Sequence, residues 1–112
     1  MTKPTVKNIL LVDDDESIRW VLNELLKDLG HKITELNSAE KALQQLKNNQ
    51  FDLLISDVRM SGQSGMELLN YCQENHPLMP VIIMTAHSDL ESAVQAYQQG
   101  AFDYLPKPFD LD

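Results

Sequence analysis

Short apolar runs alternate along this sequence with segments whose apolar residues recur at helical spacing, and few folds accommodate that order. Five such runs are predicted to be strands, at residues 9–12, 33–36, 52–56, 81–84 and 102–105. No hairpin turn sequences join them, and parallel neighbours need crossover connections, which helices supply. The order therefore predicts an α/β domain in which helices wrap a parallel five-stranded sheet.

Four helices are expected in the intervals between these strands. The first carries apolar residues from Ile18 to Leu29 and stops at Gly30, while the fourth stops at Gly100. The other helix starts are predicted from capping boxes, in which a small polar residue is followed three positions later by glutamate: Asn37 with Glu40, Ser64 with Glu67 and Ser88 with Glu91.

Size and charge exclude several classes of function. A chain of 112 residues has room for one hydrophobic core and one domain. Its net charge of -8 repels nucleic-acid phosphates and anionic lipids, and its apolar runs are too short for a membrane span or secretion signal. The single cysteine and the spacing of the histidines indicate neither a disulfide nor structural zinc. We expect a cytoplasmic protein that binds neither DNA nor membranes directly.

Chemically capable side chains follow four of the predicted strands. They are Asp13, Asp14 and Asp15 after the first strand, Asp57 after the third, Thr85 after the fourth and Lys107 after the fifth. In such sheets the carboxyl ends of the strands meet at one edge, where ligands bind. Each residue alone has a plainer explanation, because aspartates cap helices and occupy turns, threonine ends strands and exposed lysines are common. Their occurrence together at the ends of four strands favours a shared binding site.

The chemistry of that site follows from its charges. Two carboxylates ~4 Å apart repel by about 4 kcal/mol at an effective dielectric constant near 20, so a cation must offset them. Lys107 supplies one positive charge, and an oxygen-only ligand set suits Mg²⁺ where phosphate oxygens complete its shell. A carboxylate beside Mg²⁺ is a nucleophile toward an activated phosphoryl group, and the product is an aspartyl phosphate.

Four motifs together resemble the receiver domain of bacterial two-component response regulators. They are Val12-Asp13-Asp14, Ser56-Asp57, Met84-Thr85-Ala86 and Tyr104-Leu105-Pro106-Lys107-Pro108. The segments 17–22 and 80–110 are particularly similar to the receivers of NtrC-like nitrogen-regulation activators. The resemblance implies a flavodoxin-like (CheY-like), doubly wound parallel sheet with strand order 2-1-3-4-5.

The same resemblance implies roles for individual residues. Asp57 would be the phosphoacceptor, and Mg²⁺, or Mn²⁺ in its place, would be bound by Asp13, Asp14, Asp57 and the backbone carbonyl of Arg59. The phosphoryl group would be held by Thr85, the backbone of Ala86 and Lys107. Asp15 is interpreted as a helix cap or a supporting group rather than a ligand. Arg59 and His87 match positions that influence dephosphorylation. The plainer explanation of each is an exposed polar residue with no such role.

A conformational switch is implied as well. Thr85 and Tyr104 match the switch pair of the family, in which the aromatic ring turns inward when the threonine is drawn toward the phosphoryl group. The alternative for Tyr104 is an aromatic side chain packed on its strand. Lys107-Pro108 matches a family cis peptide bond, although most X-Pro bonds are trans.

The sequence departs from the family pattern in three places, at Ser61, at Ser64 and at its end. After the acceptor strand stands Met60-Ser61-Gly62-Gln63-Ser64-Gly65, where the family usually has Met-Pro-Gly-x-Asp-Gly. The family also has a fifth helix after Lys-Pro-Phe, whereas this sequence stops at Asp112, so the last helix is expected to be missing or truncated. Residues 1–112 are interpreted as one receiver domain, the N-terminal part of a longer regulator.

Such a receiver would take its phosphoryl group from a sensor histidine kinase. It would control an output of AAA+ ATPase and DNA-binding domains in a longer chain, or act as a receiver homodimer. It would catalyse its own phosphotransfer and dephosphorylation but turn over no external substrate.

Three other functions are alternatives for such a sequence. A haloacid-dehalogenase-like phosphohydrolase needs Asp-x-Asp, which Asp57-Val58-Arg59 does not provide. A flavodoxin-like FMN protein needs a hydroxyl- and glycine-rich phosphate loop where the acidic run 13–16 stands. A phosphorylation-independent interaction module with the same fold is supported only by Ser61 and the short chain.

Overall fold

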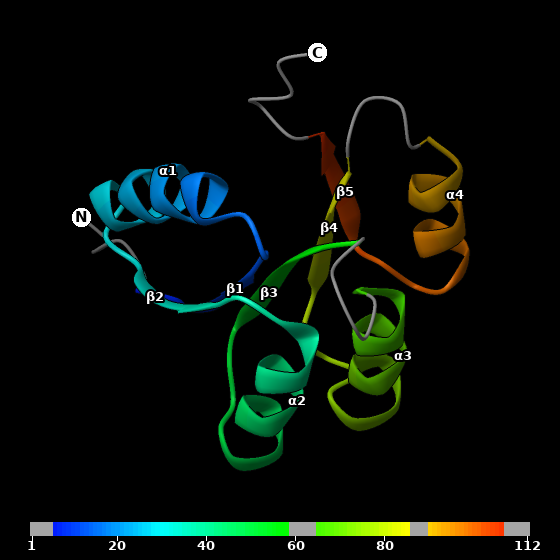
Figure 1. The fold of residues 1–112 in the computed structure, drawn as a ribbon. Helices are drawn as coiled ribbons and strands as arrows, with labels where there is room; N and C mark the ends of the chain where they lie inside the picture. Colours follow the sequence, from blue (N-terminus) through cyan, green and yellow to red (C-terminus); the bar gives the residue numbers. More distant parts are fainter. Residues whose placement is uncertain (1–5, 59–64, 86–89, 107–112) are drawn as a thin grey trace, which may run out of the picture.

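The computed structural model describes residues 6–58, 65–85 and 90–106. Five parallel strands form one sheet in the order β2-β1-β3-β4-β5, as predicted (Figure 1). The strands are β1 (Asn8–Val12), β2 (Lys32–Leu36), β3 (Leu53–Asp57), β4 (Val81–Thr85) and β5 (Asp103–Pro106). The helices are α1 (Glu16–Asp28), α2 (Ala39–Asn48), α3 (Gly65–Asn75) and α4 (Leu90–Gln98).

Alternate residues of the central strands face two separate hydrophobic clusters. Leu10 and Val12 of β1 belong to a cluster that includes residues of α2, α3 and α4. Ile9 and Leu11 belong to a second cluster, in which Ile18 and Leu22 of α1 cover the other face. Figure 1 shows α1 on one side of the sheet and α2 and α3 on the other. The apolar run of β1 is buried on both faces, as a central strand of a doubly covered sheet should be.

Burial is uneven across the sheet. Four of the five residues in β1 and in β3 are buried, and β4 is buried at every position but one. The outer strand β2 has no fully buried residue, and all four residues of β5 are exposed. The outer strand β2 contributes only partly buried residues, Ile33 and Leu36, to the two clusters.

Predicted helix ends are confirmed at three points and wrong at one. Asp15 caps α1, and Gly30 and Gly100 both have positive φ where helices end. The cap of α2 is Ser38 rather than Asn37, because Ser38 has the extended backbone and its hydroxyl accepts a bond from the Lys41 N–H at 3.2 Å. Glu40 remains in the first turn of α2, where a carboxylate complements the helix dipole.

Two predicted site residues belong to their strands instead of following them. Asp57 is the last residue of β3 and pairs with Met84, and Thr85 is the last residue of β4 and pairs with Pro106. The ladders continue one residue further than the apolar runs, because polar side chains at a strand end still satisfy the same backbone pattern.

Several predicted features lie outside the described residues. These are the substitutions at Ser61 and Ser64, the capping role of Ser88, the Lys107-Pro108 bond and the chain end expected to lack a full fifth helix. Among the described helices, none is long and apolar enough to span a membrane.

Candidate functional site

Three carboxylates converge at the edge where the central strands end. Asp13 follows β1 and Asp57 ends β3, and these strands are neighbours paired through Val12 and Ser56. One carboxylate oxygen from each of Asp13, Asp14 and Asp57 lies within 4.8 Å of the other two. Asp13 is fully buried and Asp57 is 4% exposed, while Asp14 is exposed. The convergence predicted from the strand ends is therefore present.

The cluster is suited to a hard divalent cation. Carboxylates this close repel one another by a few kcal/mol per pair, and burial weakens the screening by water. Three carboxylate oxygens, open to solvent on the side of Asp14, form a set that Mg²⁺ or Mn²⁺ accepts. The residues present thus fit the metal that the resemblance implies.

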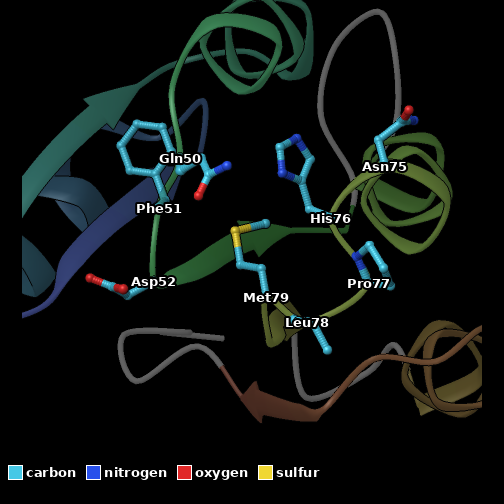
Figure 2. A pocket seen from close by; sticks show the side chains of 8 residues that line it. All are labelled: Gln50, Phe51, Asp52, Asn75, His76, Pro77, Leu78 and Met79. Atoms are coloured by element: carbon cyan, nitrogen blue, oxygen red, sulfur yellow. The ribbon is translucent and has the colours of Figure 1, made fainter.

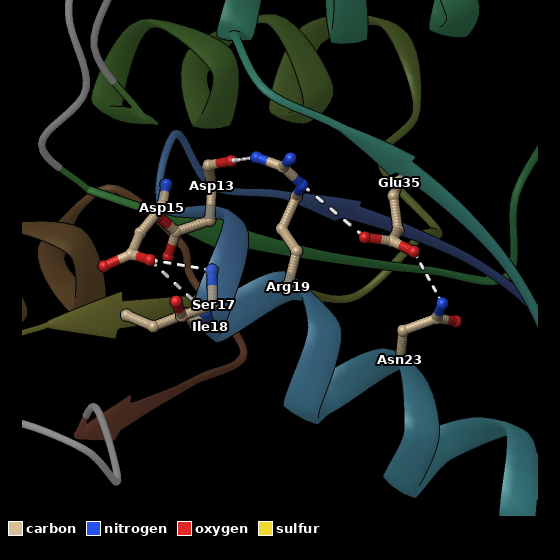
Figure 3. Close-up of polar contacts among 7 residues, drawn as sticks. All are labelled: Asp13, Asp15, Ser17, Ile18, Arg19, Asn23 and Glu35. Atoms are coloured by element: carbon tan, nitrogen blue, oxygen red, sulfur yellow. Dashed lines mark hydrogen bonds and ion pairs between the residues drawn. The ribbon is translucent and has the colours of Figure 1, made fainter.

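The turn that carries Asp13 is held by hydrogen bonds from several directions (Figure 3). The Asp13 N–H donates to the Leu36 carbonyl at 3.2 Å, which ties the turn to β2. The Asp15 N–H donates to Oδ1 of Asp13 at 2.8 Å. The Asp15 carboxylate in turn accepts from the N–H groups of Ser17 and Ile18 at 2.9 and 3.4 Å. Asp15 therefore acts as the helix cap, as interpreted, and supports Asp13.

The end of β3 is in contact with the start of α3. The Gly65 N–H donates to the Val58 carbonyl at 3.0 Å, and a Cβ placed on Gly65 would lie 2.1 Å from the Asp57 carbonyl oxygen. Only glycine fits so close to the backbone of the predicted phosphoacceptor. No local pattern in the sequence predicts this role of Gly65, because it depends on a contact between two segments of the chain.

Thr85 lies at the same edge of the sheet. It ends β4, the neighbour of β3, and is 2% exposed. Arg59, Ala86, His87 and Lys107, which were predicted to complete the site, lie outside the described residues. The described part of the site is thus the three acids with Thr85 on the adjoining strand.

Tyr104 lies at the surface, in contact with α4. Its side chain is 37% exposed, and its ring packs edge-to-face on Tyr97 with ring centres 5.6 Å apart. Oδ1 of Asp103 accepts from the Tyr97 hydroxyl at 2.7 Å and from the Tyr104 N–H at 2.8 Å. In this structure Tyr104 is thus a strand aromatic packed on a neighbouring ring, and its role as a switch residue stays a prediction. Sequence analysis also missed Tyr97 and Asp103, whose contact holds α4 against β5.

This contact gives a testable pH dependence. The hydrogen bond to Asp103 raises the pKa of Tyr97, and the hydrogen bonds from Tyr97 and the Tyr104 N–H lower the pKa of Asp103. The contribution of Tyr97 to folding stability is fully present below the ordinary tyrosine pKa of about 10. It is lost as the pH rises through the raised pKa of the folded protein. The contribution of Asp103 to folding stability is fully present above the ordinary aspartate pKa of about 4. It is lost as the pH falls through the lowered pKa of the folded protein.

Replacing Asp103 with asparagine is expected to return the pKa of Tyr97 toward its ordinary value. The measurement is an NMR titration of the Tyr97 ring in both proteins, with Tyr97→Phe to assign the signal. An unchanged Tyr97 titration in Asp103→Asn would contradict the contact.

A hollow at the opposite end of the sheet is separate from this site (Figure 2). It has a volume of about 340 Å³ and lies where the chain enters β3 and β4, with Asp52 and Met79 among its lining residues. Nε2 of His76 lies 3.0 Å from the Leu46 carbonyl oxygen there, which links the end of α3 to α2. The acids at the carboxyl ends do not line this hollow, so it is not part of the candidate site.

Comparison with known sequences decides the family. Residues 9–112 match the family described as the response regulator receiver domain. The chain belongs to this family. The receiver is 56% identical over 102 residues to the DNA-binding transcriptional regulator NtrC of Klebsiella pneumoniae, covering 91% of this chain and 22% of that protein. It is 44% identical over 105 residues to the transcriptional regulatory protein ZraR of Escherichia coli K12, covering 94% of this chain and 24% of that protein.

Solved structures agree with the assignment. NtrX from Brucella abortus matches the receiver with a TM-score of 0.88 and 33% identity, over 94% of this chain and 24% of that one. The chemotaxis response regulator CheY4 of Vibrio cholerae matches with a TM-score of 0.85 and 29% identity, over 95% of this chain and 90% of that one. The receiver spans about a fifth to a quarter of the length of NtrC and ZraR. Receiver domains of response regulators are signalling switches rather than enzymes that turn over a substrate.

Proposed function

We propose that this receiver is a phosphoacceptor switch in a two-component system and that Asp57 accepts the phosphoryl group. The observation that carries the proposal is the cluster of Asp13, Asp14 and Asp57, whose carboxylate oxygens lie within 4.8 Å of one another at the ends of β1 and β3. The phosphoryl donor is a phosphohistidine of a sensor histidine kinase, or a small acyl phosphate in vitro.

In the transfer step an oxygen of the Asp57 carboxylate attacks phosphorus. The new P–O bond forms as the bond between phosphorus and the donor breaks, and that electron pair leaves with the donor. Asp13, Asp14, Asp57 and the backbone carbonyl of Arg59 would hold Mg²⁺, or Mn²⁺, which neutralises charge on the phosphoryl oxygens when bound. The Thr85 hydroxyl, the backbone N–H of Ala86 and the Lys107 ammonium group hold the transferred oxygens.

The output follows from the change in charge at Asp57. Phosphorylation takes that side chain from -1 to about -2 and adds strong acceptor oxygens, which draw the hydroxyl of Thr85. Tyr104, held at the surface by Tyr97 and Asp103, then turns inward, and a pre-existing equilibrium shifts toward the state with the altered α4 and β5 face. Arg59 and His87 tune the rate at which the phosphoryl group is lost.

The partners are proposed from the relatives. A cytoplasmic regulator built on this receiver would place residues 1–112 before an AAA+ ATPase domain and a DNA-binding domain, and the altered face would control them directly or through a receiver homodimer. The match to a DNA-binding transcriptional regulator supports this, because the receiver covers only 22% of that protein.

The test is the intact mass of the protein after incubation with a small acyl phosphate, with Mg²⁺ and with EDTA. One added phosphoryl group that depends on Mg²⁺ is the expected result. A folded protein that binds Mg²⁺ and stays unmodified would instead favour the phosphorylation-independent interaction module.

A further inference from the structure

Arg19 reaches back from the first turns of α1 to the backbone between two of the acids (Figure 3). Its Nη1 donates to the carbonyl oxygen of Asp13 at 2.6 Å. This carbonyl belongs to the peptide unit that joins Asp13 to Asp14. The orientation of that peptide therefore sets the direction in which the Asp14 side chain leaves the backbone, and a charged donor at this distance holds it firmly.

The guanidinium group is itself held in place. Its Nε lies 3.5 Å from Oε1 of Glu35 on β2, and the Arg19 side chain is only 15% exposed. Oε2 of Glu35 accepts from Nδ2 of Asn23 at 2.5 Å. Arg19 and Asn23 are four residues apart, so both extend from the face of α1 that is turned toward β2. The network ties helix, strand and turn together.

We propose that Arg19 is a positioning residue for the divalent-cation site. It acts through the carbonyl of Asp13 and keeps the Asp13–Asp14 turn in the geometry that brings both carboxylates toward Asp57. This inference rests on the proposed function, because it concerns the same cation site. Supporting groups of this kind typically contribute ten- to a hundredfold to metal affinity.

Charge alone would act in the opposite direction. A positive guanidinium near three acids repels an incoming cation, so its removal by itself would tighten Mg²⁺ binding. The Glu35 carboxylate beside Arg19 offsets this effect. Replacing both residues with neutral side chains of similar shape leaves the local charge unchanged and isolates the positional role.

The test compares Arg19→Met/Glu35→Gln with wild type and with Glu40→Gln/Lys41→Met. The second pair makes the same change of charge on exposed residues of α2. Calorimetric titration with Mg²⁺ is expected to show about tenfold weaker binding for the first pair, at unchanged stoichiometry, and wild-type affinity for the second. A purely structural role would lower the fraction of folded protein, and hence the stoichiometry, without changing the affinity.

A kinetic measurement accompanies the titration. In phosphorylation by an acyl phosphate, the half-saturating Mg²⁺ concentration should rise by about tenfold, while the rate at saturating Mg²⁺ stays within about twofold of wild type. Affinity equal to or tighter than wild type in the folded Arg19→Met/Glu35→Gln protein would overturn the proposal.

A second variant is available in case the first does not fold. If Arg19→Met/Glu35→Gln does not fold, Arg19→Lys replaces it, because one ammonium group cannot reproduce the guanidinium fork. That variant should bind Mg²⁺ several-fold more weakly, and wild-type affinity in it would overturn the proposal.

The test is also distinct from that of the proposed function. Failure of the wild-type protein to accept a phosphoryl group would refute the proposed function, but the order of Mg²⁺ affinities among the variants would still be a separate result.

Discussion

Replacing Asp57 with asparagine is expected to abolish phosphoryl incorporation and to leave the fold intact. The amide has the shape of the carboxylate but lacks the negative oxygen that attacks phosphorus. Asp57 is 4% exposed and lies within a cluster of acids, so removing its charge also relieves repulsion. In EDTA the free energy of unfolding should therefore stay unchanged or rise by about 1 kcal/mol.

The measurement is intact mass after treatment with an acyl phosphate and Mg²⁺, together with urea unfolding. Asp52→Asn is the matched control, because Asp52 stands just before the other end of the same strand, where Oδ2 accepts from the Asn8 N–H at 2.8 Å. That control should be phosphorylated normally. Incorporation into folded Asp57→Asn, or its loss from Asp52→Asn, would mean that the acceptor has been misassigned.

The second large effect is expected at Gly65. An alanine Cβ there would lie 2.1 Å from the Asp57 carbonyl oxygen and 2.8 Å from the Val58 Cα, and both are backbone atoms that cannot move aside alone. The start of α3 must therefore shift away from β3. We expect Gly65→Ala to lower the free energy of unfolding by about 3 kcal/mol and Tm by roughly 15 °C.

The Gly30→Ala variant is the control that separates the cost of crowding at Gly65 from the cost of backbone strain. Gly30 has a φ of +93°, and nothing lies within 4 Å of a Cβ placed there, so this substitution should cost only about 1 kcal/mol. Thermal unfolding of the two variants measures the difference. Equal losses would show that the contact between Gly65 and Asp57 is not tight in solution. The Gly65 variant should also bind Mg²⁺ more weakly, because its displaced helix pushes on the Asp57 backbone.

The parallel sheet could be predicted from the periodicity of the sequence, and the convergence of the acids from the sheet together with the family resemblance. Buried parallel strands are short apolar runs, and residues after them share one edge. The strand order that the family resemblance implied then places Asp13 beside Asp57. The cap of α2 could not be predicted as securely, because Asn37 and Ser38 are adjacent polar residues and only the backbone angles distinguish them.

Other parts of the site depend on contacts that no local pattern records. The long side chain of Arg19 could have pointed to solvent, and only the position of β2 brings Glu35 beside it. Gly65 looks like an ordinary residue of a loop until the end of β3 is placed against it. The outward position of Tyr104 is likewise set by Tyr97 on another element.

The burial of the two central strands fixes the position of the acids. The acids extend from β1 and β3, whose residues are almost all buried, so their positions are anchored by the most stable region of the molecule. The helix α4 contacts β5 through Tyr97 and Tyr104, whose ring centres are 5.6 Å apart. Under the proposed function, a phosphoryl group on Asp57 would therefore act on the face of α4 and β5 from a fixed base, because the strands that carry the acids are the best anchored part of the described sheet.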